Sequence, residues 1–492
     1  MKKIVYLTII STWIFLVSCG DFLSEYPKDL IYVNSISDLD ELLVGEAYMQ
    51  TRQSVDEFGD MAIPGWIHVM DDDVEMQMQY GERPQFTSFY CWLERPFQNE
   101  YGAPEDDRVW SRLYEHIAAL NVILNKVKEF EGDTEGYSRV KGQAHFLRAG
   151  YYFLLTNLYA QPYVKETAEN VPGVPLKLSD EVEDKLFTRA SLEEVYQLLI
   201  TDLKEAIKHL KQVNMTSVYK ASEAAAHALL SRVYLYMGDW ENAIAESDTV
   251  MNAGYGLLDY NQIGNGESTL FADSPETIFS QGEYRLDHIM RDDAAYKCSA
   301  DLLNAFYDKE HDLRYINNVM GTYSGAFLIR KLKQWKDGGI SDCFLIRLAE
   351  VYLNKVEALA MSGKETEAAD LLQSYLEKRF VPGSEPTFDR QGKGLVDFIR
   401  NERRLELCME GHRWFDLRRY AVTSKYALKT QIRHQHYIYS SSNYQILNDG
   451  YYDLAAFPED GGWVLPIPSY ELIYNGLGLV NNDRPVRTLI KK

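Results

Sequence analysis

Two pairs of segments share a helical spacing of apolar residues around a glycine turn, and this feature constrains the fold most strongly. In the first pair the turn is Gly238-Asp239-Trp240, and the residues at helical intervals around it are His227, Leu230, Ser231, Tyr234, Ala243, Ser247 and Val250. In the second pair the turn is Gly363, flanked by Tyr352, Val356, Leu359, Ala368, Leu372 and Tyr375. Intervals of three and four residues place such side chains on one helix face. A single hairpin cannot bury this face alone, so the sequence predicts hairpins stacked into a solenoid.

This spacing matches that of tetratricopeptide repeats, in which a small residue such as Ala243 lets two helices approach closely. The expected fold is therefore mostly α, a tetratricopeptide-like helical-hairpin solenoid scaffold with long irregular loops and a few short strands. Further helices are predicted over residues 37–48, 110–127, 141–160, 191–210, 220–237 and 394–420. Ser37 or Asp38 is expected to cap the first of these, and Ser191 with Glu194 forms a capping box for the fourth.

Outside these helices the sequence predicts less regular structure. Four prolines, with many aromatic and acidic residues, indicate long surface loops over residues 56–109. Residues 277–280 are expected to form a strand, 301–308 a short helix and 321–335 strand with turns. The final 70 residues return to loops and short strands.

The N-terminal residues predict the compartment. Lys2 and Lys3 precede an uncharged, mostly apolar run with the length of a signal-peptide core, and the run ends in Leu16-Val17-Ser18-Cys19, which resembles a bacterial lipobox. We therefore expect residues 1–18 to be a signal peptide, Cys19 to be lipidated and residues 19–36 to form a tether. The alternative is an ordinary secretory signal. The folded body would then comprise an N-terminal region with helical repeats and aromatic loops, residues 37–270, and a C-terminal region, residues 271–492.

The charge and the remaining cysteines exclude some classes of protein. Lys and Arg number 51 against 73 Asp and Glu, a net charge of −22 that repels phosphate backbones, so nucleic acid is not expected as a partner. Cys91, Cys298, Cys343 and Cys408 contain no CxxC pair. We expect buried thiols or one incidental disulfide, and no zinc site.

Catalytic and metal-binding motifs are absent from the sequence. It contains no HExxH, GxSxG or GxxxxGK[ST] motif. His434 and His436 share one face of a predicted strand, but no third ligand is apparent, and two solvated histidines are expected. Asp71-Asp72-Asp73 could ligate a structural Ca²⁺ ion, although without EF-hand spacing, and the alternative is a loop patch of acids. No cofactor is expected.

Three glutamates on one helix face invite a glycosidase interpretation. Glu402, Glu406 and Glu410 are four residues apart, whereas catalytic carboxylate pairs usually come from separate elements flanking a cleft. Arg403, Arg404 and Arg413 are interleaved with them, and Asp416 and Arg419 continue the pattern. We therefore predict a salt-bridge network that ties this helix to its neighbours, not a catalytic site.

Several motifs together resemble the SusD/RagB lipoproteins of Bacteroidetes. They are Cys19-Gly20-Asp21-Phe22-Leu23 after the lipobox, Phe146-Leu147-Arg148-Ala149 followed by Tyr151-Tyr152-Phe153, Arg347-Leu348-Ala349-Glu350-Val351-Tyr352-Leu353-Asn354 with Glu357-Ala358-Leu359, the run of acids and arginines from Glu402 to Arg419, and Leu465-Pro466-Ile467-Pro468 with Glu471 and Asn475. They occur in the expected order over nearly the whole chain. One departure is Gly476, where the family usually carries proline.

The resemblance implies a non-catalytic, lipid-anchored protein of the outer membrane that faces the exterior. Such a protein lies as a lid over a SusC-like TonB-dependent transporter and captures oligosaccharides for import. The alternative within the same family is a RagB-like capture of peptides or glycoproteins. The solenoid would face the transporter, and loops would form the outward ligand face.

Aromatic residues predict where a sugar would bind. Sugar rings stack on flat aromatic side chains beside polar groups that reach their hydroxyls. The stretch richest in such residues holds Trp66, Asp72, Tyr80, Arg83, Phe89, Tyr90, Trp92, Asn99 and Tyr101, and a second supply lies at Tyr296, Tyr323 and Trp335. We expect one ligand to contact both groups of residues. The alternative for each ring, notably Trp66 and Trp92, is that it fills the core beneath the loops.

Overall fold

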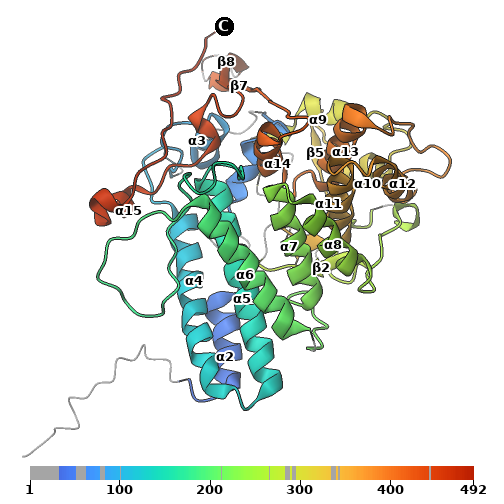
Figure 1. Ribbon diagram of the computed structural model, residues 1–492. Helices are drawn as coiled ribbons and strands as arrows, with labels where there is room; N and C mark the ends of the chain where they lie inside the picture. Colours follow the sequence, from blue (N-terminus) through green and yellow to red (C-terminus); the bar gives the residue numbers. More distant parts are fainter. Residues whose placement is uncertain are drawn as a thin grey trace, which may run out of the picture.

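A curved row of paired helices forms most of the molecule (Figure 1). The computed structural model describes residues 33–50, 62–77, 84–99, 101–211, 213–264, 266–282, 289–290, 295–333, 340–341, 344–440, 442 and 445–491. The helices of the row are α4 (Arg108–Lys126), α5 (Thr134–Tyr159), α6 (Leu192–Leu210), α7 (Glu223–Met237), α8 (Trp240–Met251), α11 (Leu348–Met361), α12 (Glu365–Leu376) and α13 (Gly392–Leu407). Each packs on its neighbour in the row from α4 to α8; α8 then packs on α11, which contacts both α12 and α13. The predicted helical-hairpin scaffold is confirmed.

Both glycine turns have the backbone that the hairpins require. Gly238 ends α7 with φ +72° and ψ +19°, and Gly363 follows α11 with φ +88°. Glycine adopts this left-handed conformation without the steric cost that a Cβ imposes. The chain therefore reverses at both positions, and α8 packs on α7 as α12 packs on α11.

Helix starts follow the capping residues and differ from the predictions in two places. Ser35, not Ser37 or Asp38, caps α2 (Ile36–Leu42), and Asp38 is its partner in the capping box. A π-helical turn, Leu43–Ala47, completes this segment. Helix α5 begins at Thr134, seven residues before the predicted start, and Asp133 caps it by accepting the Gly136 N–H. Gly136 leaves room for this cap, since a Cβ there would lie 2.5 Å from the Asp133 carboxylate. The predicted capping box of Ser191 and Glu194 opens α6.

The predicted helix over residues 394–420 is two helices. After α13 the backbone of Cys408 is extended, and both Met409 (φ +61°) and Gly411 (φ +87°) are left-handed. The chain turns there and begins α14 (Arg413–Val422). Helical spacing of apolar residues continues across the break, so periodicity alone did not reveal it.

Much of the stretch expected as surface loops is instead regular and buried. It contains a 3₁₀ helix at Gly65–Val69, strand β1 (Val74–Met76) and helix α3 (Pro84–Tyr90). Ile67, Val69 and Met70 are buried in the core. The prediction of long surface loops is wrong for this part, because the prolines mark turns between short elements whose apolar side chains join the core.

Short strands form four two-stranded antiparallel sheets within the described residues: β1 with β3, β2 with β6, β4 with β5, and β7 with β8. Their bounds are β2 (Thr277–Phe279), β3 (Tyr296–Cys298), β4 (Val319–Gly321), β5 (Phe327–Ile329), β6 (Ile346–Arg347), β7 (Ile432–Ser440) and β8 (Gln445–Leu454). Strand β7 packs on β1, and β3 packs on β5. The β1–β3 sheet thus contacts both the β4–β5 sheet and the β7–β8 sheet.

The remaining helices are short: α9 (Ala300–Ala305), α10 (Leu313–Asn318) and α15 (Ser469–Tyr474), with 3₁₀ turns at Val127–Phe130, Tyr260–Gln262, Gly461–Trp463 and Gly476–Gly478. The predicted strand over 277–280 and the short helix over 301–308 correspond to β2 and α9. The C-terminal hairpin strands, of nine and ten residues, are longer than expected. No helix in the described part of the chain is long and apolar enough to cross a membrane.

Candidate functional site

Two glutamates of α13, Glu402 and Glu406, and Glu410 in the turn that follows form the centre of a buried ionic network. Glu406 is fully buried and lies 2.5 Å from an Arg347 nitrogen and 2.8 Å from an Arg379 nitrogen, and the Tyr375 hydroxyl donates to it at 2.5 Å. Burial alone would raise the pKa of Glu406, but the two guanidinium groups hold it well below its usual value. Glu406 is therefore a fixed anion within the core.

The neighbouring acids are paired in the same way. The ion pairs are Glu402–Arg314 (2.8 Å), Glu410–Lys331 (2.5 Å), Glu410–Arg347 (2.8 Å), Asp416–Arg403 (2.9 Å), Asp416–Arg419 (2.7 Å) and Glu357–Arg419 (2.7 Å). They connect α13 to α10, α11 and α14 and to the strand region. Glu402, Glu406 and Glu410 are all buried and face cations, not a cleft. The predicted structural role of this motif is confirmed.

Three of the predicted ligand-binding rings are core residues. Tyr90, Trp92 and Tyr296 are buried, and the Trp92 indole donates to the Met70 carbonyl oxygen at 2.9 Å. The ring of His434 stacks on Tyr90 (4.0 Å between centroids) and on Trp92 (4.3 Å). These rings fill the core beneath the loops, which was the alternative to a role at the ligand face, because protein covers their faces.

The two histidines of β7 do not form a solvated pair, which corrects the expectation. The two ring nitrogens of His434, which is buried, lie 2.7 Å from the Tyr90 carbonyl oxygen and 2.9 Å from that of Asp71. His436 is half-buried and lies 3.6 Å from Asp449. Main-chain carbonyls of α3 and of the loop before β1 thus hold His434, and Asp449 of β8 lies beside His436.

The aspartate triplet is bound by arginines. Their carboxylate oxygens come within 4.8 Å of one another, the sole such group among the described residues. Arg413 donates two hydrogen bonds to Asp72, and Arg404 lies 2.7 Å from Asp73. Burial raises the pKa of Asp71 well above its usual value, and the charges of its two neighbours add to this rise. Two guanidinium cations in contact with the acids disfavour Ca²⁺ here, so the arrangement matches the acid-patch alternative.

Other predicted residues reach the surface. Trp66 is half-buried and stacks on Phe89 at 4.3 Å. Asn99 accepts the N–H groups of Tyr101 and Ala103, which fixes a turn whose Tyr101 ring is 84% exposed. Tyr323 is fully exposed at the turn between β4 and β5. Tyr80, Arg83 and Trp335 lie outside the described residues, as do Cys19 and Cys343.

The two groups of predicted ligand-binding residues, within 66–101 and within 296–335, contact each other through Tyr90 and Tyr296. Met76 of β1 pairs with Tyr296 of β3, and the rings of Tyr90 and Tyr296 are 5.4 Å apart. Strand β5, next to β3, leads back to the Tyr323 turn. Buried rings from segments far apart in the sequence are thus in contact. Among the predicted residues that the structure describes, Trp66, Tyr101 and Tyr323 are the exposed or half-exposed rings.

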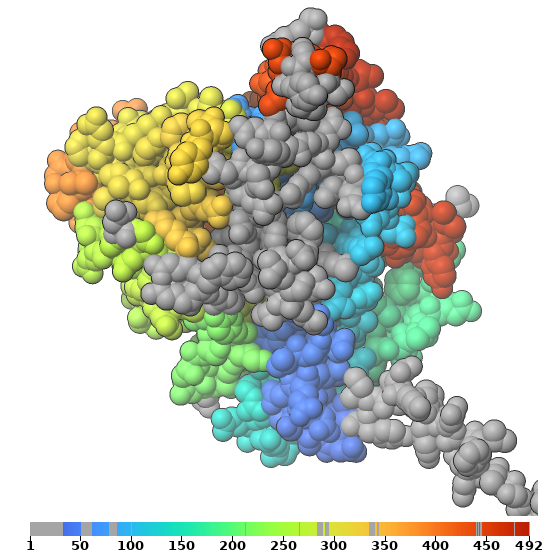
Figure 2. Space-filling model, turned by 180° about the vertical axis from the view of Figure 1, so that it is seen from behind, coloured from blue at the N-terminus to red at the C-terminus, as the bar shows by residue number. Residues whose placement is uncertain are grey.

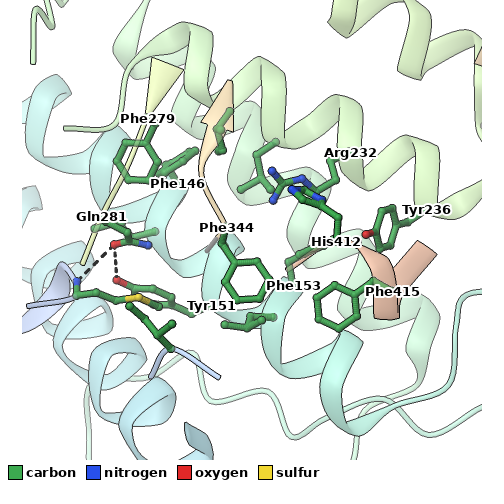
Figure 3. Close-up of a pocket in the computed structure, with 17 residues that line it drawn as sticks. Phe146, Tyr151, Phe153, Arg232, Tyr236, Phe279, Gln281, Phe344, His412 and Phe415 are labelled. Atoms are coloured by element: carbon green, nitrogen blue, oxygen red, sulfur yellow. Dashed lines mark hydrogen bonds between the residues drawn. The ribbon is translucent and has the colours of Figure 1, made fainter. Parts of the chain in front are cut away.

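Two hollows were not predicted from the sequence. One is an interior cavity of about 70 Å³ lined by Tyr151, Arg232, Tyr236, His412 and further aromatic rings (Figure 3). It is far smaller than the roughly 300 Å³ at which ligand pockets begin. The other is an open cleft of about 490 Å³ between α4 and α15. Glu471 and Asn475, which belong to the C-terminal motif of the family resemblance, line this cleft. That motif is the sequence feature from which the cleft could have been found.

Cys91, Cys298 and Cys408 are buried, which agrees with the expectation of buried thiols for these three. Burial raises the pKa of the Cys298 and Cys408 thiols, to about 11 for Cys408. Thiols in this state are unreactive at neutral pH. They contribute to packing.

Two family models match consecutive parts of the chain. Residues 262–484 match the model described as the SusD family, and residues 74–235 match one described as starch-binding associating with outer membrane. The chain belongs to the SusD/RagB family. This is a family of non-catalytic binding proteins, so the absence of an active site expected from the sequence is confirmed by family membership.

Individual relatives of this SusD-family chain agree over most of its length. A SusD-like protein P2 of Formosa agariphila is 22% identical over 542 residues, covering 98% of this chain and 99% of the relative. A SusD-like protein of Bacteroides ovatus is 22% identical over 68% of this chain and 67% of its own.

Solved structures share the fold. A SusD superfamily protein from Bacteroides thetaiotaomicron superimposes with a TM-score of 0.69 at 23% identity, covering 91% of this chain and 98% of that one. A SusD-like carbohydrate binding protein from Bacteroides vulgatus gives a TM-score of 0.67 at 20% identity, over 91% and 98% of the two chains.

Proposed function

We propose that this chain captures oligosaccharides at the cell surface and delivers them to a SusC-like TonB-dependent transporter. The observation that carries the proposal is the pairing of β1 with β3, which brings Tyr296 against the segment that holds Tyr90 within a SusD scaffold. One matching family model is described as starch-binding, and a relative of the same fold as carbohydrate binding.

The chemistry of the exposed residues supports a neutral sugar ligand. Trp66, Tyr101 and Tyr323 offer aromatic faces that can stack on the C–H face of a sugar ring. Asn99 has its carbonyl oxygen engaged with the loop backbone, which leaves its amide N–H groups for hydroxyls. The net charge of −22 disfavours anionic ligands.

Binding of glycans to the purified full chain tests the first half of the proposal. We expect at least one neutral oligosaccharide to bind on an array, and Tyr101→Ala to weaken that binding about tenfold. The matched control is Tyr219→Ala, an exposed tyrosine on the turn before α7. Binding of peptides and of no glycan would favour the RagB-like alternative and contradict the sugar assignment.

Anchoring and transport need separate tests. Lipidation of Cys19 places the chain in the outer membrane, since several acyl chains bind a bilayer firmly where one does not. Protease added to whole cells should degrade the protein, and Cys19→Ala should release it.

Two proteins confined to one membrane associate even through modest contacts. Affinity purification in mild detergent should therefore recover a transporter of the TonB-dependent class, and its absence would contradict the partnership.

A further inference from the structure

An open aromatic cleft is lined by residues outside the contacting sheets β1–β3, β4–β5 and β7–β8, which we call the short-strand layer. Helix α4 forms one wall, the strap of residues 175–187 the second and α15 the third. Figures 1 and 2 both show α15 beside the strap, away from the row formed by α11 to α13. The cleft has a volume of about 490 Å³. This lies within the roughly 300–1,000 Å³ of ligand pockets.

Hydrogen bonds hold the three walls in place. The Tyr114 hydroxyl of α4 donates to the Pro175 carbonyl oxygen at 2.7 Å, which ties the strap to α4. The Tyr470 hydroxyl of α15 donates to the Asp107 carbonyl oxygen at 3.1 Å. Asn475 accepts the Phe187 N–H at 2.9 Å, which ties α15 to the strap. Rings fixed through their polar ends keep their faces for a ligand, and such preorganisation lowers the entropic cost of binding.

The lining combines aromatic faces with few polar groups. Trp110, Tyr114, Phe187, Tyr470 and Tyr474 supply the rings, and Tyr474 is 82% exposed at the rim. Glu471 lies among them and accepts a hydrogen bond from Asn475 at 2.9 Å. Burial raises the pKa of Glu471, and hydrogen bonds from the Trp110 indole and from Asn475 only partly offset this rise. A carboxyl in this position can hydrogen-bond to a ligand hydroxyl.

The surrounding charges disfavour ionic ligands of either sign. Residues 176–187 of the strap carry four acids and two lysines, and Glu471 adds a further acid, so an anion would be repelled. The ammonium groups of Lys177 and Lys185 lie 6.0 and 4.9 Å from the Phe187 ring centre. Because these lysines already occupy the cation-binding face of Phe187, a cationic ligand would have to displace them.

We propose that the cleft between α4 and α15 binds a neutral sugar ring, as a second carbohydrate site separate from the aromatic residues around the short-strand layer. The sugar stacks on the ring of Tyr474 or Tyr470, and Glu471 hydrogen-bonds to its hydroxyls. A second site would let one long glycan contact the protein at two places. This inference rests on the proposed function for its ligand class, but it concerns different residues.

Fluorine NMR of the full chain labelled with 5-fluorotryptophan separates the two sites. Trp110 reports on the cleft and Trp66 on the short-strand end, and Trp110→Phe and Trp66→Phe assign their signals among the eight tryptophans. The probes are hexasaccharides of glucose, xylose, mannose and galactose. We expect at least one of them to shift the Trp110 signal. Tyr474→Ala should weaken that binding about tenfold, and the Tyr219→Ala control should not change it.

Each other outcome is decisive. A shift of Trp66 alone would leave the proposed function standing and overturn the cleft site, whereas no shift of either signal with any sugar would overturn both. A Trp110 shift produced by a proline- and tyrosine-rich peptide but by no sugar would overturn the sugar assignment. Glu471→Gln, which keeps the size of the side chain, provides a second variant and should also weaken sugar binding about tenfold. Unchanged affinity in both variants would overturn the cleft site.

Discussion

Arg413 donates two hydrogen bonds, each 2.7 Å long, to the two carboxylate oxygens of Asp72. Arg404, on the preceding helix, reaches Asp73 in the same loop at 2.7 Å. Both arginines belong to the motif by which the sequence resembles its family. Their role in the structure is to anchor the aromatic N-terminal segment to α13 and α14, which explains why a charged motif distant from the surface accompanies this fold.

Removing the Asp72 charge should destabilise the protein. Asp72→Asn leaves the buried Arg413 without its counter-ion, at a cost of about 3 kcal/mol in the free energy of unfolding. Chemical denaturation should show this loss, and the double variant Asp72→Asn, Arg413→Met should lose less than the sum of the two single variants. Additive losses would contradict a direct pair. Normal stability with impaired glycan binding would instead restore Asp72 as a ligand residue.

Glu406→Ala should be more damaging, because it takes one carboxylate away from two buried arginines at once and leaves Arg379 with Glu276 alone. Arg347 and Arg379 are both fully buried against this carboxylate, and breaking buried pairs costs about 3–5 kcal/mol. The matched control is Asp397→Ala on the same helix, whose pair with Lys393 is exposed and should contribute less than about 1 kcal/mol. Thermal melting compares the two variants. An equal effect of both would contradict the network.

The predictions that succeeded depend on local spacing. Helical hairpins follow from intervals of three and four residues, and the turns at Gly238 and Gly363 follow from the need for a left-handed residue. The alternation of arginines and glutamates in one short segment predicted an ionic network, but not the partners of Glu406, because Arg347 and Arg379 lie 59 and 27 residues away in sequence. Local spacing thus predicts the hairpins and the network, and not the individual pairs.

The features that the sequence left open depend on distant partners. For Trp92 the sequence allowed either the ligand face or the core; the structure buries it against Met70 and His434, and His434 comes from a strand near the C-terminus. The cleft could not be predicted from the sequence, because its walls come from three separate segments and Trp110 is far from Glu471 in sequence. Composition shows which rings are present, but not which of them the fold covers.

Trp92→Ala therefore tests burial directly. The variant removes a fully buried indole with its hydrogen bond to Met70, and such truncations cost about 3–5 kcal/mol. Tyr101→Ala, at an 84% exposed position, should change stability by less than about 0.5 kcal/mol. Denaturation of both variants is the measurement. A stable Trp92→Ala protein with weakened glycan binding would show that this ring contacts the ligand.

Asp107 gives the protein a specific dependence on pH. Its side chain caps α4 by accepting the N–H groups of Val109 and Trp110, and the Tyr159 hydroxyl donates to it. Complete burial raises the pKa of Asp107 to about 7, against 3.8 in an unfolded chain. Between these values the folded protein holds a proton that the unfolded chain has lost.

Because folding takes up this proton, the contribution of Asp107 to stability is complete below about pH 4 and is lost as pH rises through about 7. Asp107→Asn retains a good capping residue and removes the titration. The free energy of unfolding should be measured from pH 5 to 8 for both proteins. The wild type minus variant difference should fall by about 1.4 kcal/mol per pH unit up to pH 7, and then level off. Parallel pH profiles would show that Asp107 is ionised in the folded protein throughout this range.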